Sequence, residues 1–101
     1  TSKYPYLIPL IIESNSRELV LPKNKYLVNH DTTVGSLIYT IQKMLNMTQS
    51  QASIFLHINN TLMATSSSFG KLYSEDKKTR FRDENYDGFL YCVISKENTF
   101  G

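Results

Sequence analysis

The chain has 101 residues, 41% of them hydrophobic, and a formal net charge of +2. This length and apolar content predict one packed domain and exclude a disordered tail, and the small net charge gives no indication of nucleic-acid binding. A single cysteine, Cys92, excludes an internal disulfide and favours a reducing compartment, and no apolar run approaches the roughly 20 residues of a membrane-spanning helix.

Two strands are predicted in the first third of the chain. Residues 6–13 are rich in β-branched and aromatic residues and are followed by the turn-forming run 14–16. Pro9 within this strand cannot donate a ladder hydrogen bond, so we expect it at an unpaired edge or a bulge. Residues 25–29 predict a second short strand after a polar loop. The two strands are expected to pair as an antiparallel hairpin.

An amphipathic helix is the clearest element of the sequence. Its apolar positions recur at the helical spacing i, i+3, i+4, i+7 and i+11. They are Val34, Leu37, Ile38, Ile41 and Leu45. Side-chain oxygens of residues 31–33 are suited to cap the free amide groups at its start.

The second half of the chain predicts a strand, a short helix and a last strand. Residues 54–58 form the strand, which ends at the turn signal Asn59-Asn60. Residues 66–73 predict a short helix with a serine cap, although Gly70 weakens it, and residues 89–94 predict the last strand. The segment 75–87 carries four basic and five acidic residues, whose charges largely cancel. A solvated loop is favoured there over a surface that contacts lipid or RNA.

These elements predict an α+β fold of the ubiquitin-like β-grasp type. A four-stranded mixed sheet would be crossed by one main helix and joined by a short second helix. Residues 1–95 would form the domain and residues 96–101 a flexible C-terminal conjugation tail. A terminal glycine, Gly101, gains nothing from packing, so it indicates either chemistry on its carboxylate or an accidental end of the chain.

Specific residues carry a resemblance beyond this pattern. The matching segments run through nearly the whole chain in order: Lys3-Tyr4-Pro5, Ile8-Pro9-Leu10-Ile11-Ile12-Glu13, Lys25-Tyr26-Leu27-Val28, Thr33-Val34-Gly35, Ile58-Asn59-Asn60, Leu72-Tyr73, Asp87-Gly88-Phe89-Leu90-Tyr91 and Thr99-Phe100-Gly101. The chain resembles the autophagy ubiquitin-like modifiers of the GABARAP and light-chain-three family.

The resemblance implies a conjugatable modifier and not an enzyme. Gly101, preceded by the tail residues Thr99 and Phe100, would be activated by an ATP-using E1-like enzyme and passed to an E2-like cysteine. It would then be joined to the amine of phosphatidylethanolamine. The end at Gly101 resembles the form already trimmed by the family's processing and deconjugating cysteine protease. The implied location is the cytoplasm, and the autophagosome membrane after conjugation.

The resemblance also implies a docking module for autophagy receptors with aromatic-x-x-aliphatic motifs, which would bind as an added strand. By position, an aromatic pocket would be lined by Pro9, Lys25, Leu27 and Phe89. An aliphatic pocket would be lined by Tyr26, Val28, Leu37 and Thr40, with Ile41 beneath. Read without the resemblance, the apolar members of these sets are plain core.

Departures from the family pattern affect both pockets. The family usually has two helices before Lys3, where this sequence has Thr1 and Ser2, so we expect part of the aromatic pocket's wall to be missing or altered. Leu37 replaces a usual phenylalanine, Thr40 a leucine and Met44 a basic residue. The second pocket should therefore be shallower and more polar.

Other functions receive less support from the residues. The related autophagy modifier that is joined to a protein lysine, and a non-conjugated ubiquitin-like interaction module, stay open as alternatives. Cys92 lies in an apolar strand, where a thiol acts as a small hydrophobe and not as the nucleophile of a site with His30 and Asp31. Two scattered histidines and one cysteine lack zinc spacing, so we expect no metal and no cofactor.

Overall fold

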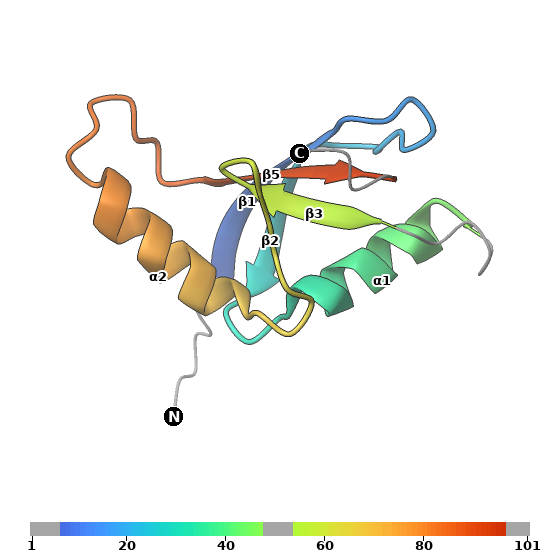
Figure 1. The fold of residues 1–101 in the computed structure, drawn as a ribbon, viewed down its shortest axis with the longest axis horizontal. Coiled ribbons are helices and arrows are strands. Elements are labelled where there is room, and N and C mark those ends of the chain that lie inside the picture. The colour runs from blue at the N-terminus through green and yellow to red at the C-terminus, as the bar shows by residue number, and fades with distance from the viewer. Residues whose placement is uncertain (1–6, 48–53, 97–101) are drawn as a thin grey trace.

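The computed structural model describes residues 7–47 and 54–96, and these form a five-stranded mixed sheet with two helices (Figure 1). The elements are β1 (Leu7–Ser14), β2 (Lys25–Asn29), α1 (Val34–Met44), β3 (Phe55–Ile58), β4 (Thr61–Leu62), α2 (Phe69–Arg80) and β5 (Leu90–Ser95). The strand order is β2-β1-β5-β3-β4, with β1 and β5 parallel in the centre. The predicted β-grasp plan and the β1–β2 hairpin are confirmed.

The predicted count of four strands is wrong, because a fifth strand follows the Asn59-Asn60 turn. Both asparagines have positive φ angles, 53° and 63°, as in the tight hairpin turns that favour this residue. The turn returns the chain to pair Thr61 with Ile58 and Leu62 with His57. A strand of two residues is too short to produce a periodic signal in the sequence.

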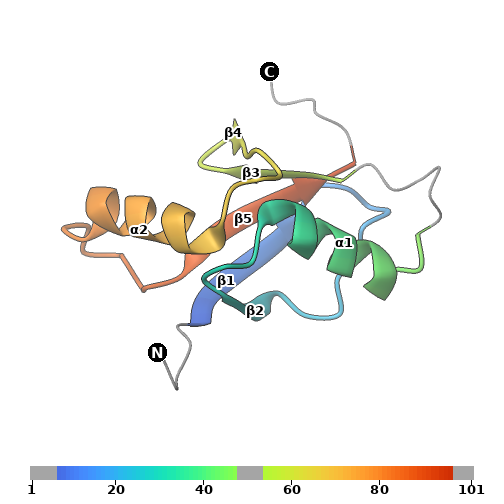
Figure 2. The same cartoon turned by 90° about the horizontal axis from the view of Figure 1, so that it is seen from below.

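The core lies between the sheet and the two helices, which Figures 1 and 2 show on one side of β3 and β5. Helix α1 buries the face predicted from its spacing, and Thr33 caps it by accepting a hydrogen bond from the Ser36 amide at 3.1 Å. Alternate residues of β1 and β5 meet this face, as the pleat requires. The buried cluster includes Ile8, Leu10, Ile12, Leu90, Cys92, Ile94 and Phe69.

Pro9 lies inside the sheet and not at its edge, because β1 is flanked by β2 and β5. It stands opposite Leu27 on the β2 side. On the other side, pairing with β5 begins only at the next residue, Leu10 opposite Leu90. Pro9 therefore lies just before the first residue of β1 that pairs with β5, and this is the unpaired position expected for it.

Helix α2 is longer than predicted and takes up half of the segment that was expected to be a solvated loop. It begins after Ser68, whose hydroxyl accepts from the Lys71 amide, and it continues to Arg80. Gly70 lies within the helix and does not break it. A Cβ at this position would lie 2.8 Å from the His30 carbonyl oxygen, so only glycine permits this close approach of the two backbones. The expectation of a solvated segment is wrong for Asp76, whose side chain is only 5% exposed.

No helix in residues 7–47 or 54–96 is both long enough and apolar enough to cross a membrane.

Candidate functional site

Strand β2 forms one edge of the sheet, next to β1 (Figure 1). Its side chains alternate in exposure: Lys25 and Leu27 are exposed, and Tyr26 and Val28 are half-buried. This follows from the pleat, which sends successive side chains to opposite faces. An edge strand also offers a row of backbone N–H and C=O groups to an added strand. β2 therefore has the geometry that strand addition requires.

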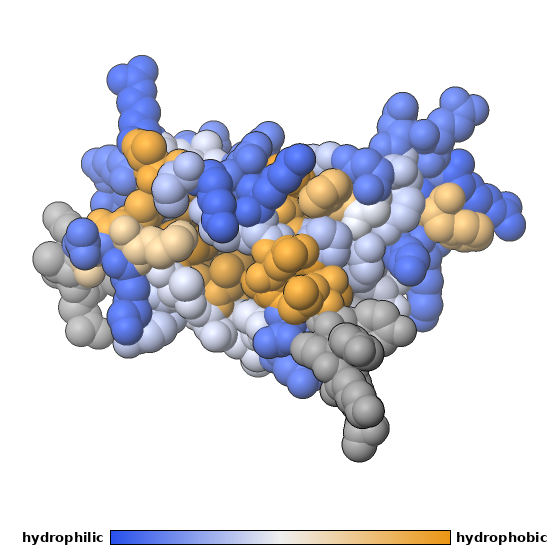
Figure 3. Space-filling model, turned by 180° about the vertical axis from the view of Figure 1, so that it is seen from behind, coloured by the Kyte–Doolittle hydropathy of each residue, from blue (hydrophilic) through white to orange (hydrophobic). Residues whose placement is uncertain are grey.

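The four residues predicted for the aromatic pocket lie on one face of the sheet. Pro9 stands opposite Leu27, and Lys25 is two residues away from Leu27 on the same face. Phe89 precedes the buried Leu90, and the Lys25 Nζ lies 5.7 Å from the centre of its ring. Leu27 is 66% exposed, and Figure 3 shows apolar surface near the start of β1. The structure brings these four together, while their role as a pocket stays a prediction.

Two residues that sequence reasoning did not assign extend the same face. Ile11 stands opposite Lys25 on one side and Tyr91 on the other. Ile11 is buried, whereas Tyr91 is exposed. Their alternation with core residues of the same strands was the available signal. The face therefore runs from β2 across β1 to β5.

The residues predicted for the aliphatic pocket divide into core and surface. Leu37 and Ile41 are buried in the core, and Tyr26 and Val28 pack against it half-buried. Thr40 is exposed on α1, and its hydroxyl donates to a backbone carbonyl one turn earlier. The accessible part of this side consists of two partly buried strand residues and one polar helix residue. That these residues form a shallow, polar second pocket stays a prediction.

Helix α2 holds the backbone around Phe89, and sequence reasoning did not predict this contact between the helix and the chain before β5. Arg80 Nη2 donates to the Phe89 carbonyl oxygen at 2.9 Å, and the Tyr73 hydroxyl donates to the Gly88 carbonyl oxygen at 2.8 Å. Arg80 also pairs with Asp76, with its Nη2 3.0 Å from Asp76 Oδ2. The spacing of four residues between Asp76 and Arg80 was the signal that could have predicted both the helix and the pair.

The family of the chain follows from comparison with known proteins. The family model "Autophagy protein Atg8 ubiquitin like" matches residues 1–101. The chain belongs to the Atg8 family. It is 43% identical over 101 residues to autophagy-related protein 8c of Arabidopsis thaliana, covering 98% of this chain and 78% of that protein. It is 40% identical over 102 residues to autophagy-related protein 8 of Dictyostelium discoideum, covering 99% and 78%.

A solved structure supports the same assignment. The crystal structure of Trypanosoma brucei ATG8 matches this Atg8-family protein with a TM-score of 0.72 and 30% sequence identity, over 92% of this chain and 75% of that one. The protein is therefore a ubiquitin-like autophagy protein with the family's fold, as the resemblance in the sequence implied.

The residues predicted to form the end of a conjugation tail in this Atg8-family protein, Thr99, Phe100 and Gly101, lie outside the described residues. Lys96, the first residue of the predicted flexible tail, forms an ion pair, with its Nζ 2.7 Å from Glu18 Oε1 in the loop between β1 and β2. The boundary predicted between residues 95 and 96 stays a prediction, although β5 ends at Ser95.

Cys92 is a core residue of β5. It is 1% exposed, and burial raises the pKa of its thiol to about 12. His30 and Asp31 form an exposed pair at 3.0 Å. Because a neutral buried thiol does not attack a substrate, the interpretation of Cys92 as a small core residue is confirmed. Among the described residues, no cluster of three histidine, cysteine or acidic side chains could hold a metal ion.

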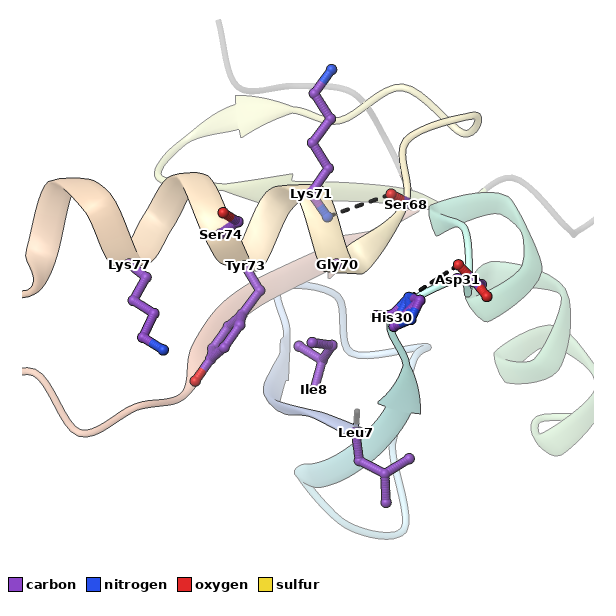
Figure 4. A pocket seen from close by; sticks show the side chains of 10 residues that line it. All are labelled: Leu7, Ile8, His30, Asp31, Ser68, Gly70, Lys71, Tyr73, Ser74 and Lys77. Atoms are coloured by element: carbon purple, nitrogen blue, oxygen red, sulfur yellow. Dashed lines mark hydrogen bonds and ion pairs between the residues drawn. The ribbon is translucent and has the colours of Figure 1, made fainter. Parts of the chain in front are cut away.

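A separate cleft of about 680 Å³ lies between α2 and the start of β1 (Figure 4). Tyr73 and Lys77 extend from the side of α2 that faces β1, and Ile8 lies between Tyr73 and His30 in this view. None of the residues predicted for docking lines it. Its lining consists of Leu7, Ile8, His30, Asp31, Ser68, Gly70, Lys71, Tyr73, Ser74 and Lys77.

Proposed function

We propose that this Atg8-family protein is a modifier, and not itself an enzyme, that recruits autophagy receptors through short aromatic-x-x-aliphatic motifs. The observation that carries the docking role is the position of β2 at one edge of the sheet formed by the described residues. There, exposed Lys25 and Leu27 alternate with half-buried Tyr26 and Val28. A peptide added along this edge gains main-chain hydrogen bonds. Its alternate side chains reach the two faces of the sheet, which gives specificity.

On the exposed face, the aromatic anchor of the motif would contact Pro9, Leu27 and the Phe89 ring. The aliphatic anchor would lie by Val28 and Thr40. Thr40 is exposed and its hydroxyl is polar, so this second contact buries less apolar area than a leucine would provide. We therefore expect modest affinity for such peptides.

Conjugation is the second half of the proposal and rests on the sequence of the tail and on family membership. Gly101 would be the acyl donor to the amine of phosphatidylethanolamine, delivered by E1-like and E2-like enzymes and released by the family's cysteine protease. The unconjugated protein would be cytoplasmic and the conjugated form would lie on the autophagosome membrane. A protein lysine is the alternative acceptor, because an amine of either kind accepts an acyl group from a thioester.

The test uses purified wild type and Gly101→Ala with cognate activating and conjugating enzymes, ATP and phosphatidylethanolamine liposomes, followed by mass. The proposal expects a lipid-sized mass increase in wild type and none in the variant, since the added methyl group lies at the reacting residue. Adducts of equal yield in both would contradict conjugation through Gly101. A wild-type adduct on protein lysines, with none on lipid, would favour the alternative acceptor.

A further inference from the structure

Two consecutive peptide groups before β5 are fastened to helix α2. The Tyr73 hydroxyl donates to the Gly88 carbonyl oxygen at 2.8 Å, and Arg80 Nη2 donates to the Phe89 carbonyl oxygen at 2.9 Å. Tyr73 and Arg80 are seven residues apart, so they project from the same face of the helix. The Phe89 amide in turn donates to Asp87 Oδ1 at 3.0 Å. The backbone of Phe89 is therefore held at both its N–H and its C=O.

Arg80 is itself fixed from several directions. Its Nε and Nη2 donate to the two carboxylate oxygens of Asp76 at 3.0 to 3.1 Å. Its guanidinium lies 4.9 Å from the Tyr86 ring centre and 5.8 Å from the Tyr91 ring centre. A planar guanidinium can make a forked contact and a stacking contact together, which an ammonium cannot. The group therefore has little freedom to leave the Phe89 carbonyl.

Arg80 therefore joins the second half of α2 to the backbone that precedes β5. We propose that Arg80 is a positioning residue for the docking site: it fixes the Phe89 backbone and so the ring that would contact a motif's aromatic anchor. The inference rests on the proposed function of the β2 edge. A ring held in place before binding lowers the entropy cost of association.

The test compares wild type with the double variant Asp76→Leu/Arg80→Met, which removes both charges together and leaves no buried carboxylate unpaired. Lys78→Met is the matched control, because it removes an exposed cation from the same helix. Calorimetry is done with an aromatic-x-x-aliphatic peptide and with the same peptide carrying alanine at the aromatic position. Circular dichroism checks that each variant is folded.

We expect the double variant to bind the aromatic peptide about fivefold more weakly than wild type. This factor corresponds to the loss of one hydrogen bond, here the bond that holds the Phe89 backbone. The alanine peptide should bind both proteins equally, and Lys78→Met should match wild type. A uniform loss of stability would not produce this selectivity. If the double variant does not fold, Arg80→Lys decides, since its ammonium keeps a charge against Asp76 but lacks the fork, and a loss in the same direction is expected.

Two outcomes would overturn the positioning role alone: unchanged affinity for the aromatic peptide, or an equal loss for both peptides, in a folded variant. In either case a wild type that binds the peptide, and loses binding on Leu27→Glu, leaves the docking function intact. A wild type that binds no such peptide overturns the docking function, and the role of Arg80 with it.

Discussion

The ammonium group of Lys25 lies 5.7 Å from the centre of the Phe89 ring. Lys25 belongs to the edge strand β2 and Phe89 immediately precedes β5, so the contact spans β1 and joins two elements that are distant in sequence. It places a positive charge beside the apolar surface formed with Pro9 and Leu27. The exposed face of the sheet thus has an apolar centre with a cation at its border.

The polar character of the second contact predicts that Thr40→Leu strengthens peptide binding. Leucine adds apolar area that the aliphatic anchor can cover, and we expect a gain in affinity of about threefold to tenfold. The measurement is calorimetry with an aromatic-x-x-aliphatic peptide. Thr79→Leu is the control, because Thr79 likewise donates to a backbone carbonyl but lies on α2. Equal affinity in Thr40→Leu and wild type would remove Thr40 from the site.

The basic residues near the end of α2 should differ sharply in their contribution to stability. Arg80→Ser leaves the buried Asp76 carboxylate unpaired, so we expect the free energy of unfolding to fall by about 3 kcal/mol. Lys77→Ser, Lys78→Ser and Arg82→Ser remove exposed charges and should each cost less than about 1 kcal/mol. Urea denaturation at pH 7 measures all four. Similar costs for Arg80 and the lysines would contradict the pairing.

Alkaline pH should destabilise the protein. Burial raises the pKa of the Cys92 thiol to about 12. Burial and, as a smaller cause, the Tyr73 hydroxyl raise the pKa of the Tyr86 hydroxyl to about 12. In the unfolded chain the thiol has a pKa of about 8.5 and the tyrosine hydroxyl a pKa of about 10. The folded state therefore binds more protons in this window. The stabilisation is complete below pH 8.5 and is lost as the pH rises toward 12.

Urea denaturation at pH 7, 9 and 10.5 tests this dependence. The free energy of unfolding should fall in that order, and Tyr86→Phe should show a smaller decrease between pH 9 and 10.5. A free energy that stays constant or rises over this range would contradict the assigned burial of both groups.

The sequence predicted the elements whose side chains follow a clean period. Helix α1 was found because its apolar residues recur at helical spacing. The strand at 25–29 was predicted as a short run after a polar loop, and the structure shows how Lys25 and Leu27 alternate in exposure with Tyr26 and Val28. The face shared by Pro9, Leu27 and Phe89 followed from resemblance and not from period. The spacing of residues along the chain cannot predict that residues from three different elements lie close together.

The second half of α2 was missed because its residues are mostly charged and give no apolar stripe. The helix is stabilised there by one buried pair, Asp76 with Arg80, and by contacts to the loop that precedes β5. Whether an acid and a base four residues apart are buried depends on what packs over them. That information is not local, so the charged run was interpreted as solvated.

The central claim is that partner motifs dock along β2, and the affinity of one peptide for two variants tests it most directly. Leu27→Glu places a charge where the aromatic anchor would be buried, and Val20→Glu places the same charge at another exposed apolar residue. Calorimetry with an aromatic-x-x-aliphatic peptide should show binding at least about tenfold weaker for Leu27→Glu and unchanged for Val20→Glu. Wild-type affinity in a folded Leu27→Glu variant would contradict the account.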